Sequence, residues 1–301
     1  MSNERERILK LLEDGKITAD QAARLIEAIG TERAEPQFGM GPHMPFGPRP
    51  FRMRSGMKHL DRIPDVVETA VASAMKNGFE PGEERSTEFP DKRHLLVKSV
   101  SGDLEVTRGD EERVGLSYSG GMVKVRTSGD QVVVRTMAGD VSAVVPRNGR
   151  LELEVVSGDI SINEGDARIQ VKTVSGDVDI AQTTGDAQVR TVSGDVNLYR
   201  VTGSLEVETR AGDVDVVAAG PVPGSIATVS GDVTVALPKD ADLVVEMAVE
   251  DDGDIDVDSD LPHEVMEQRE RYLRVKLGTG SRTLVVKTRD GDIAVRAAEE
   301  K

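Results

Sequence analysis

The sequence is defined first by what it lacks. Its 301 residues include no cysteine and no tryptophan, and aromatic residues make up only 3%. Without cysteine the chain can form no disulfide and has no thiolate for catalysis or metal binding. No apolar run approaches the roughly 20 residues of a membrane span, and the first residues do not resemble a secretory signal. These absences predict a cytoplasmic chain and leave peripheral association with an envelope open.

Positive charge is also scarce. The chain has 38 Lys and Arg residues against 54 Asp and Glu residues, for a net charge of −16. An excess of acid repels phosphate backbones, so we expect no nucleic-acid partner. The 4 histidines are scattered and form no ligand pattern. The sequence therefore predicts no catalytic residue and no cofactor.

A short phrase, Thr-Val-Ser-Gly-Asp-Val, recurs at 173–178, 191–196 and 228–233. Apolar and polar residues alternate after each Gly-Asp pair, which indicates short half-buried strands between Gly-Asp turns. The aspartates that precede an aliphatic residue recur at about 18–19 residues or about twice that spacing. They are Asp103, Asp140, Asp159, Asp177, Asp195, Asp213, Asp232, Asp254 and Asp292.

This period predicts a mainly β fold, a single-chain parallel β-solenoid of about ten rungs. One unit buries only about five or six aliphatic side chains, worth on the order of 10 kcal/mol. Ordering its residues costs more, at roughly 1.5 kcal/mol each. The rungs must therefore stack, with each strand pairing to its counterpart one unit along the chain. A two-sheet β-roll and a three-sided β-helix both fit the period.

Four segments divide the chain: a helical hairpin at 1–30, a basic Pro/Gly/Met-rich linker at 31–60, a capping helix and lead-in at 61–90, and the β-solenoid at 91–297. Within the third, residues 61–77 have apolar side chains at helical spacing, which we expect to cover the first rung. These side chains are Ile63, Val67, Ala70, Val71 and Ala74.

The hairpin carries two capping boxes, at Asn3 with Glu6 and at Thr18 with Gln21. Thirty residues bury too little apolar surface to be stable alone, so the apolar face must dock on something. This predicts a protein partner or self-association through the hairpin. The docking candidates are Leu9, Leu12, Leu25, Ile26 and Ile29.

The linker is positively charged in an otherwise acidic chain, because Pro36 to Leu60 contains no Asp or Glu. Its cations are Arg49, Arg52, Arg54 and Lys58. They fit a soluble linker that lies along an acidic solenoid, and they also fit a weak contact with an anionic membrane.

The period breaks between Asp251 and Gly280, and over residues 252–260 aspartate alternates with Gly, Ile, Val and Ser. The candidate calcium ligands there are Asp252, Asp254, Asp256 and Asp258. An EF-hand starting at Asp254 would need Gly at Ser259 and Glu at Val265, so an outward strand face is the alternative interpretation. Residues 261–271 predict a short helical insertion.

Two resemblances add to this. Residues 8–18, ILKLLEDGKIT, and 21–29, QAARLIEAI, resemble the SHOCT-like helical hairpin. The Ser-Gly-Asp-Val array resembles a bacterial β-strand-repeat family of unknown function, of the "putative adhesin" type. The combination is similar to bacterial proteins associated with envelope stress. The resemblance implies the solenoid fold and implies no catalytic residues.

The sequence therefore favours a non-enzymatic interaction or scaffold protein with a repetitive acidic surface and a docking hairpin. A calcium-dependent surface adhesin is the alternative. A carbohydrate-active β-helix enzyme fits less well, because the turns are short and no tryptophan can stack on a sugar.

Overall fold

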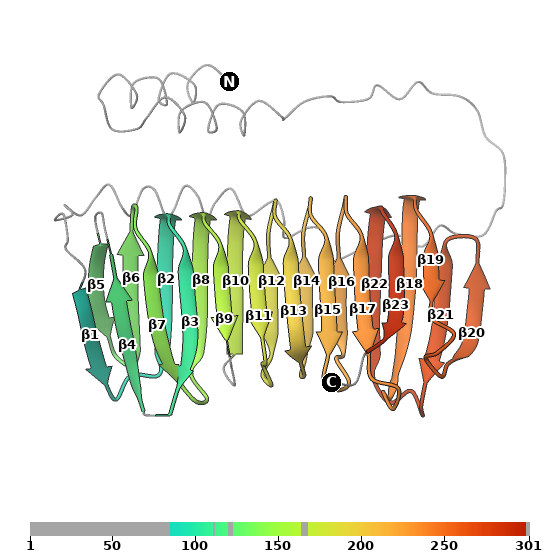
Figure 1. The fold of residues 1–301 in the computed structure, drawn as a ribbon, viewed down its shortest axis with the longest axis horizontal. Helices are drawn as coiled ribbons and strands as arrows, with labels where there is room; N and C mark the ends of the chain where they lie inside the picture. Colours follow the sequence, from blue (N-terminus) through green and yellow to red (C-terminus); the bar gives the residue numbers. More distant parts are fainter. Residues whose placement is uncertain (1–84, 111, 120–122, 164–167, 299–301) are drawn as a thin grey trace, which may run out of the picture. The chain divides into compact units, whose positions relative to one another are not determined.

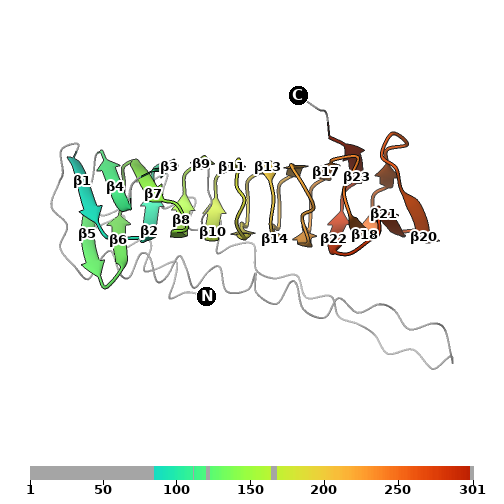
Figure 2. The same cartoon turned by 90° about the horizontal axis from the view of Figure 1, so that it is seen from below.

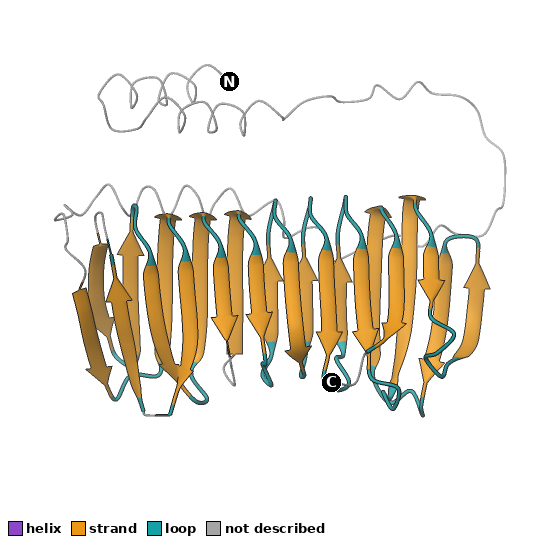
Figure 3. Cartoon of the chain, in the orientation of Figure 1, coloured by secondary structure: helices purple, strands orange, loops and turns teal. Residues whose placement is uncertain are grey.

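The computed structural model describes residues 85–110, 112–119, 123–163 and 168–298. All of them fall in the second of two units into which the chain divides, Met53–Lys301. The described residues form 23 strands (Figure 3) and include no helix that could cross a membrane. The predicted hairpin with its docking residues, the basic linker and the predicted helix at 61–77 lie outside them.

The strands form two sheets that face each other (Figures 1 and 2). The 12-stranded sheet contains, in spatial order, β20 (Glu264–Arg269), β21 (Tyr272–Leu277), β18 (Leu243–Asp252), β22 (Thr283–Asp290), β16 (Gly224–Ala227), β14 (Leu205–Glu208), β12 (Ala187–Arg190), β10 (Arg168–Ser175), β8 (Arg150–Ser157), β2 (His94–Ser101), β6 (Gln131–Thr136) and β5 (Val123–Ser128). The 11-stranded sheet contains β1 (Arg85–Pro90), β4 (Arg113–Tyr118), β7 (Val141–Pro146), β3 (Leu104–Gly109), β9 (Ile160–Asn163), β11 (Val178–Ala181), β13 (Val196–Val201), β15 (Val214–Ala218), β17 (Val233–Leu237), β23 (Ile293–Ala297) and β19 (Ile255–Val257).

Each rung consists of one strand from each sheet, joined by a Gly-Asp turn. Successive rungs pair in parallel, as β10 does with β12 and β11 with β13. The described residues contain nine such rungs, where the sequence predicted about ten. Of the two cross-sections that fit the period, the two-sheet β-roll and the three-sided β-helix, the structure has the two-sheet β-roll.

The core is a stack of aliphatic side chains between the sheets. Val171, Val189 and Val207 lie in register on neighbouring strands and are fully buried. Their neighbours along each strand face outward, because alternate residues of a strand point to opposite faces. Each buried aliphatic side chain contributes about 1.5–3 kcal/mol, and the stack supplies this only when the rungs pair.

The Gly-Asp turns stack into one column along an edge of the roll. Gly176 has a φ of 125°, and a Cβ atom on it would lie 2.2 Å from the carbonyl oxygen of Gly158. Only glycine accommodates both that conformation and that approach. Beside the glycines, the amide of Asp195 donates to Oδ1 of Asp177 at 2.9 Å. The same bond links all nine predicted aspartates, in the spatial order Asp140, Asp103, Asp159, Asp177, Asp195, Asp213, Asp232, Asp292 and Asp254.

That spatial order corrects the expectation that every strand pairs one unit along the chain. Strand β2 lies between β6 and β8, so the first rung in sequence is stacked between the second and the third. The last rung is likewise enclosed, because β22 lies between β16 and β18. Rungs with the same turn and the same aliphatic pattern are interchangeable partners, so sequence order does not fix stacking order.

Antiparallel strands close both ends of the roll. Strands β1 and β4 extend the 11-stranded sheet beyond β7, and β5 extends the other sheet beyond β6. At the opposite end β21 and β20 follow β18. The predicted helical insertion at 261–271 is therefore wrong, because Glu264–Arg269 forms a strand. Its helix-forming residues yield to the open backbone hydrogen-bonding groups of β21.

Candidate functional site

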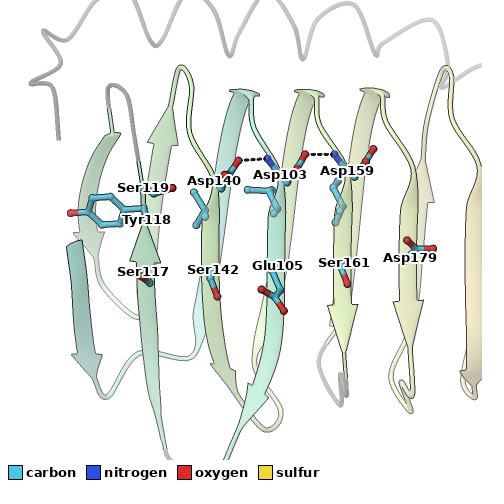
Figure 4. A pocket seen from close by; sticks show the side chains of 13 residues that line it. Asp103, Glu105, Ser117, Tyr118, Ser119, Asp140, Ser142, Asp159, Ser161 and Asp179 are labelled. Carbon is cyan, nitrogen blue, oxygen red and sulfur yellow. Dashed lines mark hydrogen bonds between the residues drawn. The ribbon is translucent and has the colours of Figure 1, made fainter. Parts of the chain in front are cut away.

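A hollow of about 390 Å³ opens on the outer face of the 11-stranded sheet (Figure 4). It is built from outward side chains of β7, β3, β9 and β11. The strand register places Glu105 between Ser142 and Ser161, with Asp179 next to Ser161. The hollow is therefore lined by hydroxyls and carboxylates at the spacing of adjacent strands.

One rim of the hollow is the end of the aspartate ladder. The amide of Asp103 donates to Oδ1 of Asp140 at 3.0 Å, and the amide of Asp159 donates to Oδ1 of Asp103 at 3.0 Å (Figure 4). Ser117 and Tyr118 of β4, and Ser119 directly after it, lie at the end of the hollow. The rim therefore combines fixed carboxylates with serine hydroxyls, while the ring of Tyr118 points away from the hollow and packs against the core (Figure 4).

The hollow presents an open, acidic lining. Its carboxylates on Asp103, Glu105, Asp140, Asp159 and Asp179 are exposed. The lining includes serine hydroxyls but no histidine or cysteine that could pair with them as base or nucleophile. The hollow offers acceptors and negative charge to a docked surface.

The same outer face continues along the roll. The row that begins with Ser142 runs through Asp179 to Asn197, whose Nδ2 donates to Oδ1 of Asp179 at 2.9 Å. A parallel row on this face includes Val144 and Tyr199, which are 39% and 48% exposed. Polar acceptors and exposed apolar side chains thus lie side by side on one sheet.

The predicted calcium ligands lie along the end of β18, the turn after it, β19 and the position directly after β19. Asp252 ends β18, Asp256 lies on β19, and the amide of Asp254 donates to Oδ1 of Asp292 at 2.8 Å as the last step of the ladder. Oδ1 of Asp258 accepts the amide of Asp260 at 2.9 Å, and this bond lowers the pKa of Asp258. Within the described ranges, no group of three or more His, Cys, Asp or Glu side chains could hold a metal ion.

The docking candidates of the hairpin and the cations of the linker lie outside the described residues. Sequence reasoning missed the hollow, although it singled out Asp103, Asp140 and Asp159 on its rim. Tyr118 comes from an antiparallel strand that carries no repeat phrase. The repeat pattern carries no sign of the antiparallel strands that close this end of the roll and complete the hollow.

The comparisons with known proteins agree with this fold. The sequence profile described as Toastrack DUF4097 matches residues 83–198 and again residues 167–296. The chain belongs to the Toastrack DUF4097 family. The two matches of that family together span the described repeats. A SHOCT-like domain profile matches residues 3–34.

Solved structures that resemble this Toastrack chain are described as adhesion proteins. One is a putative adhesin from Bacteroides fragilis, with 14% identity over 72% of this chain and 100% of that chain, at a TM-score of 0.36. Another is a putative cell adhesion protein from Clostridium sporogenes, with 13% identity over the same shares and a TM-score of 0.33. Likeness at this level says nothing about what this chain binds. The search among curated proteins found no match.

Proposed function

We propose that this chain is a non-enzymatic interaction scaffold of the bacterial envelope-stress type. It presents the outer face of its 11-stranded sheet to a protein partner, and its N-terminal hairpin brings copies together. The observation that carries the proposal is the continuous outward row of acceptors on parallel strands, with the exposed Val144 and Tyr199 beside it. Aromatic side chains such as Tyr199 are enriched in protein-binding surfaces, where polar side chains form the rim.

The sheet face can be tested with two matched variants. Full-length chain, Tyr199→Asp and Val285→Asp are immobilised and incubated with an extract of bacterial envelope proteins. Val285 faces outward on the other sheet, so it is the control. We expect the unaltered chain and Val285→Asp to capture at least ten times as much of one envelope protein as Tyr199→Asp does. Equal capture by all three would show that this face is not the binding surface.

The hairpin is tested separately by sedimentation equilibrium of the full-length chain at several concentrations. We expect the average mass to rise with concentration, and Leu25→Asp to abolish the rise, because a charge on the apolar face opposes its burial. A full-length chain that stays monomeric at every concentration would contradict self-association. Robust turnover of an envelope polysaccharide by the purified chain would contradict the non-enzymatic assignment.

A further inference from the structure

An apolar stripe runs along the outer face of the 12-stranded sheet, beside the Gly-Asp turns. Five neighbouring chain segments contribute one side chain each. The residue before each of these five is buried in the core, so the five side chains point away from it. In spatial order the stripe consists of Met137, Val100, Val156, Val174 and Val192. Arg210 follows Val192 and ends the stripe.

Positive charge borders the stripe. Arg135, Lys98, Lys172 and Arg190 lie two residues before stripe members on the same outer face. Lys98 pairs with Glu154, and Arg190 pairs with glutamates on β14 at 2.7 and 3.0 Å. Within the described residues, Arg135 and Lys172 have no such partner.

The charge is densest at the end of the stripe near Met137. Lys124 on β5 lies directly opposite Arg135 on β6, and like charges so placed repel each other. Burial and the nearby guanidinium groups of Arg126 and Arg135 lower the pKa of Lys124. The Nε atom of Arg135 is buried and has no hydrogen-bond partner in the described residues. The chain as a whole has a net charge of −16, and acidic groups placed beside this cluster would relieve its repulsion.

We propose that residues 61–77 form a helix that lies across these strands and covers the stripe. The apolar face of that segment, from Ile63 to Ala74, would extend over about 17 Å at 1.5 Å per residue. The five stripe positions span about 19 Å, at roughly 4.8 Å between strands. Intermediate positions match too, since Ala70 lies about 10 Å from Ile63 and Val156 about 10 Å from Val192.

The short segment between the proposed helix and β1, residues 78–84, sets the direction of the helix. Strand β1 begins at Arg85, at the same end of the roll as β5 and β6 (Figures 1 and 2). Residues 78–84 can span at most about 25 Å, so the C-terminal end of the helix must lie at the Met137 end. This path would bring Glu80, Glu83 and Glu84 toward Lys124 on β5 and Arg135 on β6, which have no ion pair within the described residues. Charge and length therefore favour this segment of the same chain as the occupant.

The sequence placed this helix over the first rung as a cap. Within the described residues that end of the roll is already extended by the antiparallel strands β1, β4 and β5. Neither the hairpin nor the outer face of the 11-stranded sheet takes part, so this inference does not rest on the proposed function.

The absence of cysteine allows a direct test, because two engineered cysteines are the only thiols in each chain. Full-length Ala70→Cys/Val156→Cys is oxidised and analysed without reductant. A disulfide requires Cα atoms about 4.4–6.8 Å apart, so it reports contact. The matched control is Ala70→Cys/Val217→Cys, because Val217 is half-buried on the outer face of the opposite sheet. Val67→Cys/Val174→Cys provides a second pair if the first variant fails to fold.

We expect an intramolecular disulfide in most molecules of the stripe pairs and in less than a tenth of the control. Stripe pairs that stay reduced in folded protein would overturn the proposal. Disulfides that form only between chains would overturn it as well, since the occupant would then be a second copy. Equal cross-linking in the control would show an untethered segment and contradict a fixed position on the stripe.

Discussion

The two edges of the roll are built on different principles. At one edge, all nine turns in the described residues carry Gly-Asp, and their aspartates form a ladder of bonds from 2.8 to 3.0 Å. At the opposite edge the connections differ in length and sequence. Strands β4 and β5 enter there between β3 and β6, and β20 and β21 enter between β19 and β22.

This difference shows which edge carries the stacking and which carries the variation. A turn that must fit against identical turns above and below tolerates no added atom. A connection without such a column can lengthen into the antiparallel strands that close the ends. The repeated edge therefore sets the period, and the variable edge provides closure and the Tyr118 end of the hollow.

The largest expected effect comes from adding one methyl group to each edge. In Gly194→Ala the new Cβ would lie 2.2 Å from the carbonyl oxygen of Gly176, at a φ of 122°. We expect the free energy of unfolding to fall by about 3–5 kcal/mol, from strain and overpacking together. At the variable edge, Gly220→Ala would meet only Cγ2 of Thr202 at 3.4 Å and should change stability by less than about 1 kcal/mol. Urea unfolding followed by circular dichroism measures both, and equal losses would refute the contrast between the edges.

A smaller effect tests the buried hydroxyls beside the glycine column. The Thr191 hydroxyl donates to the carbonyl of Ser193 at 3.2 Å, whereas the equivalent hydroxyl of Thr228 is buried without a partner in the described residues. Thr191→Val should lower the free energy of unfolding by about 1 kcal/mol, and Thr228→Val should raise it by about 1 kcal/mol. Urea unfolding of both variants measures whether the two changes in the free energy of unfolding have opposite signs. A loss of stability in both variants would mean that the Thr228 hydroxyl is satisfied.

The smallest effect at neutral pH concerns the variable edge, where Asp242 holds the turn between β21 and β22. Its carboxylate accepts the Ser281 hydroxyl at 2.7 Å, the Thr279 hydroxyl at 2.9 Å and the Gly280 amide at 2.7 Å. These bonds, led by that of Ser281, lower the pKa of Asp242 to about 2 from 3.8. Because the folded-state pKa is depressed, the stabilisation is present above pH 3.8 and disappears as the pH falls through about 2.

We therefore expect Asp242→Asn to flatten the pH dependence of stability between pH 4 and 2, measured by urea unfolding at each pH. Asp240→Asn is the control, because it is an exposed carboxyl in the same connection. An unchanged pH profile in Asp242→Asn would contradict the assigned role.

Much of the fold follows from the sequence, and the candidate site follows only in part. The Gly-Asp spacing predicted the parallel strands of the rungs, their turns and every aspartate of the ladder. The hollow was not predictable, because Tyr118 and Ser117 reach it from a strand with no repeat phrase. Residues 264–269 favour a helix by propensity, and only the open edge of β21 makes them a strand.

The sequence by itself determined the period, the alternation that separates core from surface, and the need for glycine at each turn. These are local properties, because each depends on residues within one unit. The tertiary structure decided that the roll has two sheets, that the first and last rungs lie inside their neighbours, and that antiparallel strands close the ends. Those choices depend on pairing between distant units whose edges are nearly equivalent. Only the competition among all possible pairs in the folded chain selects one arrangement.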